Sequence, residues 1–138
     1  MVEFSVLGNP KPLKRHRHHK YGTYDPSKKD KEQFYIQILE HRPDKPMSGD
    51  IMVNLNFYMQ RPKSHYRTGK YSHLLKPQAP RSCHSIKPDL DNLIKFVLDS
   101  IQGDNRFIKD DSMVFMIRAS KLYDKNPRTE VSLTQLAG

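Results

Sequence analysis

The most constraining stretch of this chain runs from Lys87 to Ile101, where apolar residues recur with the period of an α-helix. Their spacing follows the i, i+3, i+4, i+7 pattern of a helix that buries one stripe. The stripe consists of Leu90, Leu93, Ile94, Val97, Leu98 and Ile101. Pro88 suits the first helical turn, and Gly103 is placed to end the helix. The sequence therefore predicts an amphipathic helix packed on a core.

Acidic residues occupy the polar face of this predicted helix and recur shortly after it. Asp91, Lys95 and Asp99 follow one another at intervals of four residues, and Asp89 lies at the helix start. The pair Asp110–Asp111 comes at the edge of the next apolar run. Acids near a helix N-terminus favour the macrodipole by about 0.3–1 kcal/mol, and an i, i+4 pair of Asp and Lys contributes about 0.2–0.5 kcal/mol. These ordinary surface roles explain one or two of the acids but not the later pair.

A metal site is the alternative to surface decoration. If Asp89, Asp91 and Asp111 converge, charges about 4 Å apart repel by roughly 4 kcal/mol at an effective dielectric near 20. Such a cluster takes up protons or a cation, and oxygen ligands without thiols suit Mg²⁺ or Mn²⁺. A divalent ion beside a basic surface can activate water for attack on a phosphodiester. Lys95, one turn along the helix, would then stabilise charge that builds on the phosphate.

The net charge favours a polyanionic partner. The 138 residues, enough for one domain with a modest core, include 24 Lys and Arg against 15 Asp and Glu, for a formal net charge of +9. Such a surplus is typical of chains that bind nucleic acid. No acidic residue occurs from Ile51 to Pro88, whereas the acids of the second half cluster around the predicted helix. This uneven distribution argues against the alternative of a generically basic surface.

The sequence also bears on location. No apolar run reaches the length of a membrane span, and the N-terminus lacks the apolar segment of a signal peptide. The single cysteine, Cys83, has no partner for an intramolecular disulfide, which fits a reducing compartment. We therefore expect a cytoplasmic protein without a membrane partner.

The remaining patterns predict an α+β fold. We expect strands at Val2–Leu7, Asp50–Gln60, Met113–Tyr123 and Thr129–Thr134, and a first helix from Ser27 to about residue 42. The order β-α-β-loop-α-β-β predicts a single domain in which two main helices pack on a mixed or antiparallel sheet.

Finer patterns predict how these elements begin and which side chains face the core. The odd positions from Ile51 to Met59 are uniformly apolar and should face inward. In the strand that starts at Met113, the first half is apolar on both faces. Its apolar positions are Met113, Val114, Phe115, Met116, Ile117 and Ala119. Ser27 with Asp30 resembles a capping box at the start of the first helix.

Two basic segments have no clear periodicity. The run from Lys11 to Lys20 alternates Lys and Arg with His, which favours an arm that contacts phosphates over a histidine metal site. The segment 61–86 combines cations with tyrosines and prolines, and either grips nucleic acid or is a solvated insertion. The residues that we expect to contact DNA are Lys11, Lys14, Arg15, Arg17 and Lys87.

The motif around the central helix resembles a known family. The run Lys87-Pro88-Asp89-Leu90-Asp91-Asn92-Leu93-Ile94-Lys95, with Leu98-Asp99 and Asp110-Asp111-Ser112-Met113-Val114, is similar to the signature of RusA-type Holliday-junction resolvases, the crossover junction endodeoxyribonucleases. The resemblance is specific across residues 87–121 and extends more weakly to residues 8–12. It implies that residues 1–138 form one RusA-like nuclease domain with a basic loop at about residues 61–86.

This resemblance implies an activity and a set of roles. Family members are Mg²⁺-dependent homodimeric endonucleases, often encoded by phages or prophages, that nick four-way DNA junctions symmetrically in recombination and repair. Matched residue by residue, the essential acids fall on Asp89, Asp91 and Asp111, which would hold the metal, and the catalytic lysine falls on Lys95. Asp99, two turns from the helix start, is expected to be structural and to pair with Lys95.

Two other readings stay open at this point. One is a nuclease for other branched DNA such as flaps or forks. The other is a non-catalytic DNA-binding module whose acids merely cap a helix.

Overall fold

The computed structural model describes residues 1–15, 17–19 and 22–136, with the segment 17–19 described by its backbone alone. Its main sheet has four strands in the order β1-β6-β4-β5. The strands are β1 (Val2–Leu7), β4 (Ile51–Gln60), β5 (Val114–Asp124) and β6 (Arg128–Gln135). β6 runs antiparallel to both β1 and β4, whereas β4 and β5 are parallel. The sheet is therefore mixed, and the predicted α+β class is confirmed.

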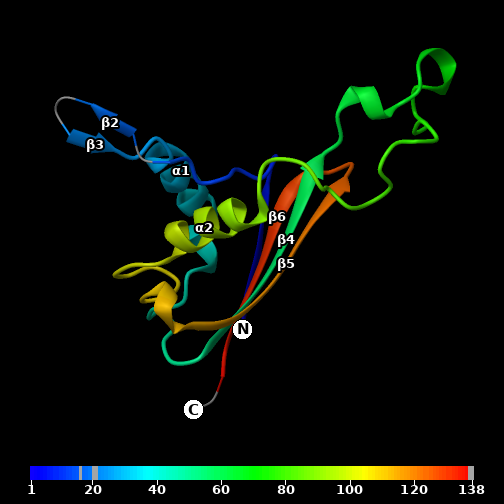
Figure 1. Cartoon of the computed structure of the whole chain (residues 1–138). Coiled ribbons are helices and arrows are strands. Elements are labelled where there is room, and N and C mark those ends of the chain that lie inside the picture. Colours follow the sequence, from blue (N-terminus) through cyan, green and yellow to red (C-terminus); the bar gives the residue numbers. More distant parts are fainter. Residues whose placement is uncertain (16, 20–21, 137–138) are drawn as a thin grey trace.

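Two helices cover one face of this sheet. α1 (Lys28–Ile38) continues into a short 3₁₀ turn, Leu39–His41, and α2 (Leu90–Ile101) packs beside it. The rings of Phe34 and Phe96 meet edge to face, with centroids 5.7 Å apart, where the two helices touch. The opposite face of the sheet carries no helix (Figure 1). The buried hydrophobic core of the described residues thus lies between the helices and one side of the sheet.

β4 supplies the centre of the core because it lies between two other strands. Its odd positions are at most 2 % exposed, while the residues between them are half-buried on the open face. The buried set is Ile51, Val53, Leu55, Phe57 and Met59. Burying a large apolar side chain contributes about 1.5–3 kcal/mol, so this strand is a major source of stability. The predicted alternation along this strand is confirmed.

α2 differs from its prediction in two details. The peptide bond between Lys87 and Pro88 is cis, and the helix begins only at Leu90, so the placement of Pro88 in the first turn was wrong. The end of the helix is as predicted: it ends at Ile101, and Gly103 follows the C-cap residue Gln102 with a φ of 130° that few other residues adopt. Phe96, which lies outside the predicted stripe, is buried because α1 covers it.

The start of α1 also corrects a prediction. Ser27 makes no side-chain capping bond to α1. Its hydroxyl instead accepts a hydrogen bond of 2.8 Å from the backbone N–H of Lys14. The proposed capping box was therefore wrong, and the buried Ser27 ties the preceding arm to the helix.

Both segments predicted as irregular project from the body (Figure 1). Within the first, Arg17–His19 (β2) and Gly22–Tyr24 (β3) form a small antiparallel hairpin that the sequence analysis missed. The segment 61–86, which we call the basic arm, contains only two short 3₁₀ turns, Lys63–His65 and Gly69–Tyr71. No helix of the described residues is long and apolar enough to cross a membrane.

Candidate active site

The first turns of α2 with the residue before them (residues 89–95), which we call the entrance of α2, present two exposed carboxylates. Asp89 precedes the helix in extended conformation, and its backbone carbonyl accepts the N–H of Leu93 at 3.2 Å. Its side chain makes no capping bond. Asp91 lies in the first turn and is also exposed. Among the described residues neither carboxylate has a hydrogen-bond or ion-pair partner, so both are free to meet a cation or a ligand.

Lys95 lies one turn beyond Asp91 on the same face of α2. Side chains four residues apart on a helix are neighbours, so its ammonium group lies on the same side of the helix as the Asp91 carboxylate. Lys95 is exposed, and no carboxylate of the described residues lies within salt-bridge distance of it. The entrance therefore combines two free acids with one free cation.

Lys121 of β5 holds this entrance in place. Its ammonium group donates to the backbone carbonyls of Ile86 at 2.5 Å and Pro88 at 2.6 Å. On the other side, the N–H of Leu13 donates to the carbonyl of Asn92 at 2.9 Å. Lys121 is not among the residues predicted from the sequence, although a signal was present: it is a cation at a position of β5 that faces the helices.

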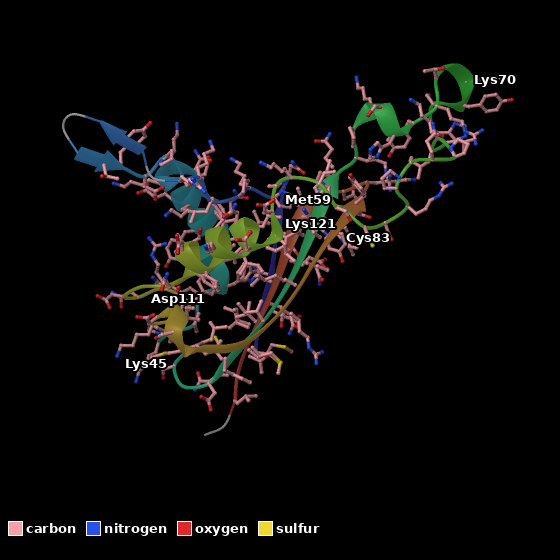
Figure 2. All side chains as sticks on the ribbon, viewed as in Figure 1. Lys45, Met59, Lys70, Cys83, Asp111 and Lys121 are labelled. Atoms are coloured by element: carbon pink, nitrogen blue, oxygen red, sulfur yellow. The ribbon has the colours of Figure 1, made fainter. Side chains whose placement is uncertain are left out.

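Asp111 lies at the other end of α2. Its backbone N–H donates to the side-chain oxygen of Gln102, the residue that follows the helix, at 3.0 Å. At 1.5 Å of rise per residue, the helix separates Gln102 from Asp89 by roughly 20 Å. Figure 2 shows Lys121 beside the start of α2 and Asp111 near its end. One chain therefore brings Asp89 and Asp91 together but does not bring Asp111 to them.

Acidic groups crowd at this far end. The pKa of Asp111 is raised by burial, by the hydrogen bond and charge of Asp110, and by the charge of Asp99. The pKa of Asp110 is lowered because its carboxylate accepts the backbone N–H of Ser112 at 2.9 Å. Asp110 and Asp111 thus share one local region of negative charge that no described cation neutralises.

Asp99 has a structural partner, but not the expected one. Its carboxylate lies 3.6 Å from the ammonium group of Lys31 on α1, which also binds Asp25 at 2.6 Å. Because Lys31 joins the two helices through Asp99, the expected pair with Lys95 was wrong.

The single chain does not assemble a complete metal site. Within the described residues, no group of three or more His, Cys, Asp or Glu side chains is placed to hold a metal ion. Asp89 and Asp91 offer oxygen ligands of the kind that Mg²⁺ prefers. The third expected ligand, Asp111, is too distant to join them within one chain.

Several cations surround the entrance and extend away from it. Lys14, Arg15 and Lys87 are exposed, whereas Lys11 is paired with Asp30 at 3.2 Å. The side chain of Arg17 lies outside the described residues.

The basic arm is ordered by its own contacts. The N–H of Arg67 donates to Leu74 at 2.9 Å, and that of Lys76 donates to His65 at 2.8 Å. The guanidinium of Arg61 lies 4.6 Å from the ring centre of Tyr123 and so fixes the base of the arm on β5. The cations exposed along the arm are Lys63, Arg67, Lys70 and Arg81.

Comparison with known proteins agrees with the motif at the entrance of α2. The protein is 29% identical, over 147 residues, to "Uncharacterized protein YqaN" of Bacillus subtilis (strain 168), an alignment that covers 99% of this chain and 97% of that protein. The sequence model of a nuclease family, described as Endodeoxyribonuclease RusA, matches residues 7–134. The matched residues include all of α1, all of α2 and the entrance of α2. The chain therefore belongs to the RusA endodeoxyribonuclease family.

Proposed function

We propose that this protein is a Mg²⁺-dependent endonuclease that resolves four-way DNA junctions by paired phosphodiester hydrolysis in recombination and repair. One observation carries the proposal: the RusA-family entrance of α2 presents Asp89, Asp91 and Lys95 exposed and without partners among the described residues. A protein that needed these acids only to cap a helix would bond them to backbone N–H groups, and the Asp89 side chain makes no such bond.

The proposed roles follow from the chemistry of each group. Asp89 and Asp91 supply oxygen ligands to a divalent cation, Mg²⁺ or its substitute Mn²⁺, and Asp111 is the third acid of the set. Such an ion activates water and neutralises phosphate charge. Lys95 is a catalytic residue that stabilises charge on the phosphate undergoing cleavage. Because one chain leaves Asp111 at the far end of α2, its contribution requires a second chain, and the active form is a homodimer.

DNA binding is assigned to the cations on both sides of α2. The hairpin β2–β3 and the basic arm project on opposite sides of this helix (Figure 1). We assign phosphate contacts to Lys11, Lys14, Arg15, Arg17 and Lys87 beside the entrance, and to the exposed cations of the basic arm. The net charge of +9 supports a polyanionic partner such as DNA.

Replacing Asp91 with Asn tests the proposal directly. This substitution removes one negative charge and keeps the shape of the side chain. We expect cleavage of a synthetic four-way junction in Mg²⁺ to fall by at least two orders of magnitude, because the charge that binds the cation is lost. Binding of the junction, measured by gel shift in Ca²⁺ or EDTA, should persist or tighten because an acid near the DNA is removed.

The matched control is Asp44→Asn, an exposed acid remote from α2 in the sequence, which should cleave like the wild type. Undiminished Mg²⁺-dependent cleavage by the Asp91→Asn variant would contradict the site assignment. Cleavage of flaps or forks in preference to junctions would favour the nuclease for other branched DNA. No cleavage of any branched DNA by the wild type would favour the binding module.

A further inference from the structure

A pocket of about 240 Å³ lies between the two helices and the sheet. β1 and β4 are both antiparallel to β6, so their C-terminal ends, Leu7 and Gln60, lie at the same edge of the sheet. Asn9 borders the pocket, and its side-chain oxygen accepts the backbone N–H of Gln60 at 2.9 Å. Lys121, near the C-terminal end of the parallel strand β5, holds the entrance of α2 at this same edge.

Two connections place the pocket next to the candidate active site. The chain that leaves β1 runs from the pocket wall at residues 8–11 to Leu13, whose N–H donates to the carbonyl of Asn92 at 2.9 Å. Phe96 lines the pocket and directly follows the entrance along α2. At 1.5 Å of rise per residue, Phe96 is about 8 Å from Asp91 along the helix axis. A DNA strand held at the entrance can therefore reach the pocket with a neighbouring nucleotide.

The pocket combines an apolar interior with polar walls. Phe34, Phe57 and Phe96 form the apolar part and belong to the buried core. Gln33 and Gln37, one turn apart on α1, contribute side-chain amides that bond no other described residue. An amide both donates and accepts hydrogen bonds. A nucleobase fits such a lining, because it is a flat ring with donors and acceptors along its edge.

Thr129 of β6 adds a hydroxyl group to the lining. The residue is only 4% exposed, and its side chain bonds no other described residue. Buried polar groups are normally hydrogen-bonded, so this hydroxyl is available to a polar group that enters the pocket. A purely apolar ligand would leave the hydroxyl without a partner, which disfavours such an occupant.

An exposed ion pair borders the pocket. Lys11 and Asp30 both line it, and their charged groups lie 3.2 Å apart. Their side chains are 56% and 28% exposed, and an ion pair in contact with water contributes little to stability. The pair can therefore open when a ligand enters. Lys11 then neutralises a phosphate, while the carboxylate of Asp30 accepts a hydrogen bond from an amino group of a base.

We propose that this pocket binds one unstacked base of the DNA strand that is held at the entrance of α2. The inference rests on the proposed function, because the strand must lie at the same entrance. Taking a base out of the stack costs least where pairing is already interrupted, as it is at a branch point. The bound base fixes the position of the strand relative to Asp91 and Lys95.

Fluorescence of 2-aminopurine tests the proposal without cleavage. This adenine analogue is quenched while it is stacked in DNA and becomes bright when it leaves the stack. Four-way junctions that carry it at successive positions from the branch point are bound in Ca²⁺. We expect the wild type to brighten one position several-fold. Gln33→Ala/Gln37→Ala removes two amides from the exposed surface of α1, leaves the core intact and should lose most of this increase.

The matched control is Gln135→Ala. Gln135 is exposed at the opposite end of β6, so this variant should brighten the same position as the wild type does. Thr129→Val keeps the shape of the side chain, removes the hydroxyl and should weaken the response. Circular dichroism checks that each variant is folded. An equal increase in the wild type and the folded Gln33→Ala/Gln37→Ala variant would overturn the pocket assignment.

Removing the base itself gives an independent test. An abasic site at the bright position should weaken junction binding by the wild type in Ca²⁺ by about tenfold, because the contacts to the base are lost. It should have little further effect on Gln33→Ala/Gln37→Ala, since both changes remove the same contacts. Equal losses of affinity in the two proteins would contradict a base held by these amides.

These measurements separate the pocket from the proposed function. If the wild type brightened the base as expected but cleaved no branched DNA, the proposed function would fail and the pocket would stand. If the wild type cleaved junctions but brightened no position, the pocket would be overturned and the nuclease would stand.

Discussion

His84 is a buried histidine next to Lys121 of β5. Its side chain is 7% exposed, and its Nδ1 atom has no hydrogen-bond partner among the described residues. Burial lowers the pKa of His84 below its ordinary value of 6.5, and the charge of Lys121 lowers it further. His84 therefore binds a proton less readily in the folded protein than in the unfolded chain. The free energy of unfolding consequently depends on pH.

We expect this histidine to destabilise the fold as the pH decreases below about 6.5, because the unfolded state then binds the proton first. The effect begins at the unfolded pKa, reaches at most about 1.4 kcal/mol per pH unit, and levels off below the folded pKa. The free energy of unfolding, measured in urea between pH 7.5 and 5 (roughly the window in which histidine titrates), should therefore decrease faster for the wild type than for His84→Phe. Parallel curves for the two proteins would contradict the assignment. The two proteins differ only at His84, so the difference between the two curves reports this residue.

At the scale of single residues, exposure was easier to predict than position. The polar face of α2 follows from its period alone, so Asp89, Asp91 and Lys95 were found as candidate site residues and lie exposed at its entrance. The position of Asp111 depends on whether β4 and β5 are parallel, and local sequence does not encode strand direction. An acid 20 residues further along the chain than Asp91 was therefore expected at the wrong end of the helix.

At the scale of elements, periodicity predicted the parts whose burial is set by their own sequence. β4 is central and has neighbours on both sides, so its alternation matches its burial. β5 has a similar apolar pattern but lies at the edge, where Phe115 and Ile117 remain exposed. Strand order arises from contacts distant in sequence, and hydropathy does not reveal it. The β2–β3 hairpin was missed because each of its strands has only three residues, too few for a period to be detected.

At the scale of the whole molecule, the charge is arranged around the candidate site. The acids that we assign to catalysis lie at α2, and the arm that follows β4 is free of acids over its entire length. Lys70 lies at the outer part of this arm, whereas Lys45 lies near the opposite end of the molecule (Figure 2). If the arm contacts a DNA arm of the junction, these two exposed lysines must contribute differently to binding.

The salt dependence of junction binding measures that difference. Each phosphate contact adds about 0.9 to the slope of log affinity against log salt concentration, because binding releases condensed counterions. We expect Lys70→Gln to reduce this slope by about one such contact, and Lys45→Gln to leave it unchanged although both variants lose one charge. Fluorescence anisotropy with a labelled junction at several NaCl concentrations gives the slopes. Equal slopes for Lys70→Gln and the wild type would show that the tip of the arm does not contact DNA, and equal losses in both variants would indicate a general effect of net charge.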